Sequence, residues 1–244
     1  MRRKTPGNVD KDALIAGKIA FLERADPDRV IAALEPFVSD RRKERLLEVI
    51  GQRVESVQVI FESPHDPHNG AAVLRSCEAF GVQFIHVVET RERFLAAQSV
   101  ARGSEKWIDV VTHSVAAQAV QAAQEANLEL VATHPEGELF PEDLAKIPRL
   151  SLVLGNERDG IGDVLRASCK RAVRVPMRGF VESLNVSVTA AILLSHACTA
   201  RPGDLPDHER RRLYARGLYF SLTRADEMLV HLGAQPSTNP SNVT

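Results

Sequence analysis

The spacing of hydrophobic positions changes at about residue 56. Before that point apolar residues recur at helical spacing, which predicts helices over 13–23 and 28–50 with Asp26-Pro27-Asp28 as the break between them. After it, short runs rich in Val, Ile and Leu alternate with helical stretches. These runs predict strands at 57–61, 83–88, 107–111, 128–133, 150–155 and 172–176. The stretches between and after them predict helices at 69–80, 92–101, 114–126, 160–169 and 186–199.

Apolar strands that alternate with helices are typical of an α/β fold, in which a mainly parallel sheet is covered by helices on both faces. We expect this domain over 55–201, after a helical N-terminal extension over 1–54. Pro202-Gly203 opens a C-terminal part, 202–244, with a charged helix near 207–232 and a polar end that reads as a disordered tail.

The composition is that of a soluble globular protein, with 44% hydrophobic and 26% charged residues in a chain of 244. No apolar run is long enough to span a membrane, and residues 1–10 do not form a signal segment, so we expect a cytoplasmic protein without a membrane partner. Cys77, Cys169 and Cys198 are too far apart for a metal pattern and are expected to be buried, reduced side chains.

The formal net charge of −1 gives no overall attraction to nucleic acid, so an RNA partner would have to bind local basic clusters. Three such clusters stand out, each of which is either a solvated helix face or a phosphate site. They are Arg41, Arg42, Lys43 and Arg45; Lys170, Arg171 and Arg174; and Arg210, Arg211, Arg212 and Arg216.

Three segments carry candidate chemistry, and the first is HNGAAVLRSCEAFG at 68–81. Asn69 is suited to cap the helix that follows, and Gly81 to end it. Arg75 lies in an otherwise apolar stretch and needs a partner unless it is an ordinary surface arginine.

The second segment, LVLGNERDGIG at 152–162, is a strand that leads through a glycine-rich turn into a helix. Ligands tend to bind at such junctions on the carboxyl edge of a parallel sheet. It is not a phosphate-binding loop, because Ile161 and Gly162 stand where Lys and Ser or Thr are required, and it lacks the dinucleotide GxGxxG spacing. Glu157 at the tip of the turn either binds a ligand or is solvated.

The third segment is VPMRGFVESLNVSVTAA at 175–191. Ser183 and Asn185 directly precede an apolar helix, where their side chains either cap the helix or hold a polar ligand. Ser183 is not in a GxSxG context, which argues against a hydrolase nucleophile.

Together, and in this order, the three segments resemble the motifs of the SpoU/TrmH branch of the SPOUT methyltransferases. The resemblance covers roughly residues 40–200, and GSEKW at 103–107 is similar to a stretch of the tRNA-directed members. Glu182 departs from the pattern, since many relatives have glutamine there. It stands beside the site residues and bears on substrate detail.

The resemblance implies a SPOUT-type catalytic domain with a C-terminal trefoil knot, which is an exception to the rule against knots. It implies that S-adenosylmethionine is bound in a bent shape by the knot loops and that two subunits of a homodimer build each active site. Carried over by position, the cofactor residues are Thr133, Gly155, Asn156, Val175, Met177, Ser183 and Leu184.

The resemblance also assigns Arg75 to activation of a ribose 2′-hydroxyl, oriented with ribose and cofactor by Asn69, Glu157, Ser183 and Asn185. A guanidinium normally keeps its proton. Arg75 is therefore either a general base in a site that removes this proton, or a group that binds the adjacent phosphate and stabilises the developing alkoxide. No metal is required. RNA contacts are expected from His68, Arg75, Lys106, Arg41, Arg42 and Arg45.

The short N-terminus and the charged C-terminal helix favour the tRNA enzymes that modify guanosine 18, because relatives acting on ribosomal RNA often carry a larger N-terminal domain. Another tRNA or rRNA nucleotide, or a non-catalytic RNA-binding role, remains an alternative. A nucleotide-dependent oxidoreductase is disfavoured by the missing dinucleotide fingerprint.

Overall fold

The computed structural model describes residues 11–64, 66–89, 103–156, 158–199 and 201–234. The chain divides into two compact units, one formed by residues up to 52 together with those from 205 onward, the other by 53–204. These divisions lie close to the expected boundaries at 54 and 201. The N-terminal extension and the C-terminal helix, expected as separate parts, instead form one unit, and the expected disordered end at 235–244 lies outside the described residues.

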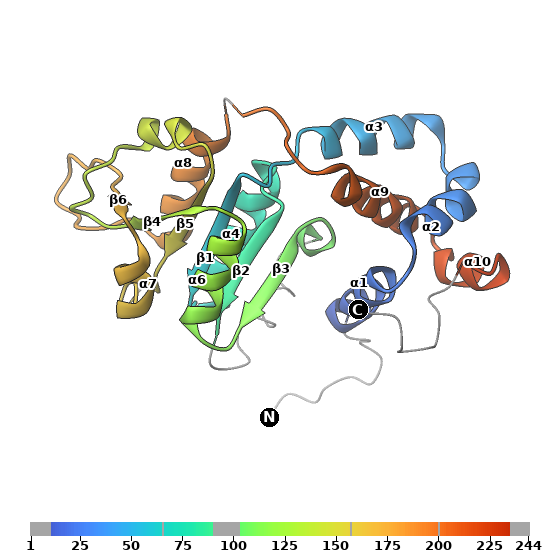
Figure 1. The fold of residues 1–244 in the computed structure, drawn as a ribbon, viewed down its shortest axis with the longest axis horizontal. Coiled ribbons are helices and arrows are strands. Elements are labelled where there is room, and N and C mark those ends of the chain that lie inside the picture. The colour runs from blue at the N-terminus through green and yellow to red at the C-terminus, as the bar shows by residue number, and fades with distance from the viewer. Residues whose placement is uncertain (1–10, 65, 90–102, 157, 200, 235–244) are drawn as a thin grey trace. The chain divides into compact units, whose positions relative to one another are not determined.

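The larger unit is built on a six-stranded sheet in the order β3-β2-β1-β5-β4-β6, with every neighbouring pair parallel (Figure 1). Val59 at the centre of β1 is opposite Ile85 of β2 on one side and Leu152 of β5 on the other. The strands are β1 (Val57–Glu62), β2 (Phe84–Val88), β3 (Asp109–His113), β4 (Glu129–Thr133), β5 (Leu150–Leu154) and β6 (Arg171–Val173). Five of them match the predicted ranges within two residues; β6 ends early, and 174–176 continue as loop.

Helices cover both faces of this sheet, which confirms the predicted α/β class. The helices α4 (Pro67–Ala79) and α8 (Val186–Cys198) share one core with Val57, Val59 and Phe61, together with the 3₁₀ segment η3 (Pro141–Lys146). The helices α6 (Ala116–Glu125) and α7 (Asp163–Ser168) share the other core with Ile60. The split follows from the alternation of side chains along β1. The helix predicted at 92–101 lies outside the described residues.

The smaller unit contains helices from both ends of the chain. These are α1 (Lys11–Glu23), α2 (Pro27–Leu34), α3 (Asp40–Gly51), α9 (Asp207–Ser221) and α10 (Ala225–His231), with the 3₁₀ turn η1 (Glu35–Phe37). The prediction of one helix over 28–50 was wrong: α2 ends before Pro36, which lacks the backbone N–H that a continuing helix needs. The single helix predicted over 207–232 is likewise divided, because Leu222 is extended.

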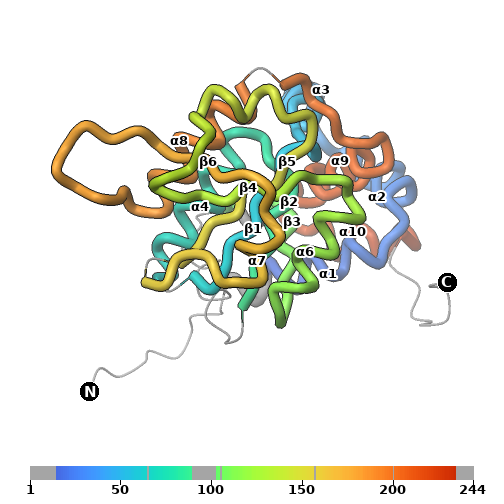
Figure 2. The backbone as a smooth tube through the Cα atoms, turned by 60° about the vertical axis from the view of Figure 1, so that its left-hand side comes forward, coloured from blue at the N-terminus to red at the C-terminus, as the bar shows by residue number. Residues whose placement is uncertain are grey.

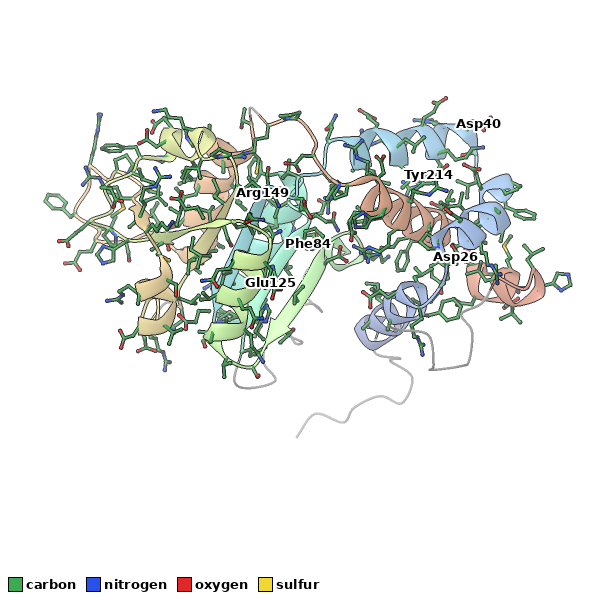
Figure 3. The ribbon with its side chains drawn as sticks, in the orientation of Figure 1. Asp26, Asp40, Phe84, Glu125, Arg149 and Tyr214 are labelled. Atoms are coloured by element: carbon green, nitrogen blue, oxygen red, sulfur yellow. The ribbon has the colours of Figure 1, made fainter. Side chains whose placement is uncertain are left out.

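The two ends are joined by close packing and by a partly buried hydrogen bond. Tyr214 lies on α9 (Figure 3). Its hydroxyl donates to the carboxylate of Glu35 at 2.7 Å, and burial together with Glu35 raises the pKa of Tyr214 to about 12. A side chain at Gly217 would place its Cβ 2.6 Å from the Leu46 side chain of α3. Glycine at 217 therefore leaves room for the Leu46 side chain, which would have to shift if a Cβ were added.

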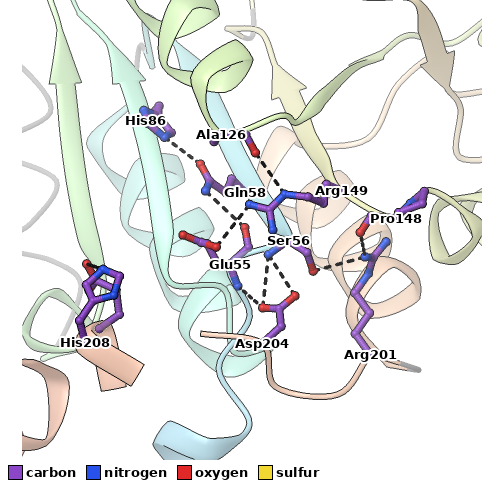
Figure 4. A network of polar contacts seen from close by, with 11 residues as sticks. Glu55, Ser56, Gln58, His86, Ala126, Pro148, Arg149, Arg201, Asp204 and His208 are labelled. Carbon is purple, nitrogen blue, oxygen red and sulfur yellow. Dashed lines mark hydrogen bonds and ion pairs between the residues drawn. The ribbon is translucent and has the colours of Figure 1, made fainter. Parts of the chain in front are cut away.

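Polar contacts at the start of β1 fix the beginning and the end of the larger unit (Figure 4). The carboxylate of Asp204 accepts hydrogen bonds from the backbone amides of Glu55 and Ser56, the former at 2.5 Å. The guanidinium of Arg201 donates to the Pro148 carbonyl and to the Ser56 hydroxyl.

No helix among the described residues is long and apolar enough to cross a membrane.

A row of buried polar side chains crosses three strands of the sheet. His86 of β2 is hydrogen-bonded through Nε2 to Gln58 Oε1 of β1 and through Nδ1 to His113 Nε2 of β3, each at 2.9 Å (Figure 4 shows the first contact). Burial, with a smaller contribution from His113, lowers the pKa of His86 to about 4. Burial also lowers the pKa of His113.

These depressed pKa values predict a loss of stability on mild acidification. In the unfolded chain His86 is protonated below about pH 6.5, whereas in the folded chain it stays neutral down to its pKa of about 4. Protonation therefore favours the unfolded chain, and the free energy of unfolding falls as the pH falls. We expect His86 alone to lower the free energy of unfolding by about 2 kcal/mol between pH 7 and pH 5. Urea unfolding of the wild type and of His86→Gln at both pH values measures this. An equal pH dependence in the two proteins would contradict it.

Candidate active site

The carboxyl ends of β4, β5 and β6 meet at one edge of the sheet and surround a cavity of about 810 Å³. Its walls come from the residues after β4, from the turn after β5, from the loop after β6 and from the first turn of α8. The lining residues are Thr133, His134, Pro135, Phe140, Gly155, Asn156, Gly160, Ile161, Val173, Arg174, Val175, Pro176, Met177, Glu182, Ser183, Leu184, Asn185, Val186 and Thr189. A cavity of this size at the ends of parallel strands suits a small organic ligand.

The turn between β5 and α7 forms one wall. Asn156 and Gly160 exchange backbone hydrogen bonds of 3.1 and 3.2 Å, and the Asn156 side-chain oxygen accepts from the amides of Arg158 and Asp159. A Cβ atom at Gly155 would lie 2.1 Å from the Gly160 carbonyl carbon. The wall therefore depends on a glycine at 155, where two backbone segments touch.

The loop 174–185 between β6 and α8 forms the opposite wall and projects from the sheet, as the orange tube in Figure 2 shows. It ends at Asn185, whose side-chain oxygen caps α8 by accepting from the Ser187 amide at 2.8 Å. The Asn185 amide nitrogen donates to Asn69 Oδ1 of α4 at 3.0 Å. This bond ties the end of the loop to α4 and fixes the orientation of both amide groups.

The cavity walls combine apolar side chains with a few polar groups. Thr133 already donates its hydroxyl to the Val153 carbonyl at 3.0 Å, so its oxygen faces a ligand chiefly as an acceptor. The guanidinium of Arg174 lies 4.8 Å from the centre of the Phe140 ring, a cation–π geometry. Among the described residues no group of His, Cys, Asp or Glu is arranged to hold a metal ion. The cavity is suited to an organic ligand that has both apolar surface and hydrogen-bonding atoms.

The structure brings together all seven residues that the sequence analysis assigned to a cofactor. Each of them lines the cavity: Thr133, Gly155, Asn156, Val175, Met177, Ser183 and Leu184. The role of these residues stays a prediction, since the cavity shows only that they share one site.

The proposed catalytic residues are only partly assembled. Ser183 and Asn185 line the cavity, and Asn69 is hydrogen-bonded to Asn185. Arg75 lies on α4 with an exposed side chain, is not among the lining residues, and makes no hydrogen bond or ion pair with the residues that the structure describes. Glu157 lies outside the described residues. The expectation that Asn69 caps α4 was wrong, because Asp66 accepts from the His68 amide in that position.

The proposed RNA-binding residues lie apart from one another along the chain and on different elements. His68 is exposed at the start of α4, and Lys106 is half-buried at the end of η2 (Ser104–Lys106). Arg41, Arg42 and Arg45 are exposed on α3 in the smaller unit, where they line a separate hollow with Ser39, Glu44 and Glu48.

The sequence analysis did not assign five residues that line the cavity with polar or aromatic side chains: His134, Phe140, Arg174, Glu182 and Thr189. His134 and Arg174 directly follow β4 and β6, so the rule that ligands bind at the carboxyl ends of parallel strands would have found both. Phe140 had no such signal, because the segment that precedes η3 showed no recognisable pattern.

Comparison with known proteins gives consistent similarities. The model of the SpoU rRNA Methylase family matches residues 56–195. The tRNA (guanosine(18)-2′-O)-methyltransferase of Escherichia coli K12 is 30% identical over 193 residues, which cover 75% of this chain and 84% of that protein. The crystal structure of the A. aeolicus TrmH/SpoU tRNA modifying enzyme has a TM-score of 0.66 at 24% identity, covering 76% of this chain and 98% of that one. The AdoMet-bound rRNA methyltransferase from Sinorhizobium meliloti has a TM-score of 0.54 at 26% identity over 62% of this chain and 59% of that one.

The contact at Gly155 predicts a strong effect of a single added methyl group. Gly155→Ala places a Cβ against backbone atoms that cannot rotate away, so we expect a loss of about 1–3 kcal/mol in the free energy of unfolding. Gly179→Ala is the matched control, because nothing lies within 4 Å of the Cβ it would add in the opposite wall. Urea unfolding of both variants checks this; equal stabilities would contradict the described geometry of the turn.

Proposed function

The chain belongs to the SpoU rRNA methylase family, and from this premise we propose that it methylates the 2′-hydroxyl of guanosine 18 in tRNA with S-adenosylmethionine as methyl donor. The observation that carries the proposal is the cavity at the ends of β4, β5 and β6, which gathers all seven residues assigned to the cofactor. The choice of tRNA over other RNA is supported by the similarity to the tRNA (guanosine(18)-2′-O)-methyltransferase of Escherichia coli.

The chemistry of the cavity fits the cofactor. S-adenosylmethionine has a flat adenine and no phosphate, and the cavity offers Val175, Met177 and Leu184 as apolar walls beside the backbone of Gly155 and Asn156. When bound, the cofactor supplies a methyl group on a positively charged sulfur. The protein then has mainly to hold the ribose oxygen in line with that methyl group and to keep water away.

Asn69, Asn185 and Ser183 are the positioning groups in this scheme. The bond between Asn185 and Asn69 fixes both amides, Asn185 in the cavity wall and Asn69 beside it, and Ser183 adds a hydroxyl in the same wall. Arg75 binds the phosphate next to the reacting ribose and stabilises the developing alkoxide, because a guanidinium keeps its proton and can only donate.

We further propose that a second copy of the chain completes the site. Arg75 is exposed and is absent from the cavity lining of the single chain. On the loop that forms the cavity wall, Phe180 is fully exposed and Val181 is 62% exposed, and Val188 on the first turn of α8 is 46% exposed. Large apolar side chains in such a group are usually covered by a partner. A symmetric homodimer would cover this loop and bring an Arg75 to the cavity.

The direct test of the function is methyl transfer from labelled S-adenosylmethionine to tRNA transcripts. We expect incorporation into a transcript with guanosine at position 18 and its loss when that guanosine is replaced by adenosine, with the modified ribose located by mass spectrometry. Incorporation only into ribosomal RNA, or at another tRNA position, would contradict the proposed substrate.

Replacement of Arg75 tests its role. Arg75→Ala should lower kcat at least about a hundredfold while the affinity for S-adenosylhomocysteine stays near that of the wild type, because the cofactor residues lie on other segments. Arg75→Lys keeps the charge but loses the planar fork, so it should be nearly as poor at every pH if phosphate binding dominates. A lysine variant whose rate recovers as pH rises would instead support a general base. Normal turnover of the alanine variant would refute both roles.

Replacement of Phe180 tests the dimer. Phe180→Asp should shift the protein from dimer to monomer in sedimentation experiments at micromolar concentration and reduce methyl transfer in parallel. Phe37→Asp, at a phenylalanine that is 58% exposed in the smaller unit, is the control and should leave the dimer intact. A wild type that sediments as an active monomer would contradict the shared site.

A further inference from the structure

A second hollow, of about 590 Å³, lies beside the cavity and opens over the core formed with α6 and α7. It is lined by the ends of β4 and β6, by the end of α7 and by the turn after β5. The two hollows share Thr133, His134, Pro135, Gly160 and Ile161, so these residues form a common wall. The remaining lining residues of the second hollow are Ala132, Glu138, Arg158, Asp159, Arg166, Cys169, Lys170, Arg171 and Ala172.

This hollow, which we call the basic hollow, has a surplus of available positive charge from Arg158, Arg166 and Lys170. All three are exposed. Arg166 donates from Nη2 to the Ile161 carbonyl at 2.9 Å, and no carboxylate among the described residues pairs with it. The side chains of Arg158 and Lys170 make no hydrogen bond or ion pair within the described residues. Their donors are free to bind a ligand.

The other charged residues of the basic hollow are already engaged. Arg171 forms two hydrogen bonds with the carboxylate of Glu129, at 2.6 and 2.9 Å. The carboxylate of Glu138 accepts from the Ala172 amide at 3.2 Å, and that of Asp159 accepts from the Asn156 side chain at 3.4 Å. The two acidic side chains therefore support the walls, and Arg158, Arg166 and Lys170 are left available for a ligand.

Two of these cations, Arg166 and Lys170, lie on a short segment of backbone that hydrogen bonds hold at both ends. The Cys169 amide is bonded to the carbonyls of Leu165 and Arg166, at 3.1 and 3.2 Å, which closes the end of α7. Two residues later, the bidentate contact of Arg171 with Glu129 fixes the start of β6. Lys170 stands between these anchors, so little backbone order is lost when it binds an anion.

We propose that the basic hollow binds backbone phosphates of the RNA that flank the reacting nucleotide. The proposal rests on the function proposed above, since it takes the adjoining cavity as the methyl-transfer site. A chain of net charge −1 has no overall attraction to a polyanion, so binding depends on local cations such as these. Several separate cations around one hollow match the repeated charges of a polynucleotide better than a single small anion.

The experiment compares a charge-removing with a charge-preserving double variant. Arg158→Gln/Lys170→Gln should weaken tRNA binding at least about fivefold at moderate salt and reduce the slope of log Kd against log salt by about 1 to 2, one unit for each lost phosphate contact. KM for S-adenosylmethionine and kcat should stay unchanged. Arg158→Lys/Lys170→Arg should keep the wild-type slope. Lys146→Gln, an exposed cation already paired with Asp143 at 2.7 Å, is the control and should behave like the wild type.

The outcomes separate this inference from the proposed function. A charge-removing variant with wild-type tRNA affinity and salt slope overturns the basic hollow, even if the protein methylates tRNA normally. A wild type that binds RNA through these residues but methylates no RNA overturns the proposed function and leaves the binding surface standing. Equal weakening by both double variants would trace the effect to shape rather than to charge and would also overturn the proposal.

Discussion

Where the chain leaves β5, the backbone of Gly155 passes against the backbone of Gly160 and Ile161 with no room for a side chain between them. The Asn156 side chain stabilises this turn by accepting hydrogen bonds from the backbone amides of Arg158 and Asp159. Because Gly160 and Ile161 line both hollows, the same turn separates the proposed cofactor cavity from the basic hollow.

The parallel sheet explains why two chemically different hollows lie side by side. Successive residues of a strand face opposite sides of the sheet. At the end of β6, Ala172 packs against the core formed with α6 and α7 and lines the basic hollow. The next residue, Val173, packs against the other core and lines the cavity. The bond between Asn69 and Asn185 then joins α4 to the end of the loop after β6, so that a residue 116 positions away in sequence holds one wall of the cavity.

The sequence predicted the strands and the cavity residues well, because hydrophobic patterning and three short motifs act locally. The sequence analysis failed where the structure depends on contacts between residues far apart in the chain. Tyr214 and Glu35, from opposite ends of the chain, join two parts that were expected to be separate into one unit. Apolar residues recur at helical spacing on both sides of Pro36, but the helix ends before this proline. The exposure of Arg75 could not be predicted either, since Arg75 stands among apolar neighbours whose buried side chains face the sheet while its own does not.

The central claim is that the cavity at the ends of β4, β5 and β6 holds the methyl donor. A crystal structure of the protein with S-adenosylhomocysteine tests this most directly. We predict that the adenine lies between Val175, Met177 and Leu184, with its polar edge against the backbone of Gly155 and Asn156, and that the sulfur faces the side of Asn185. If S-adenosylhomocysteine instead bound in the basic hollow, or anywhere away from these residues, the assignment of the cavity to the methyl donor would be wrong.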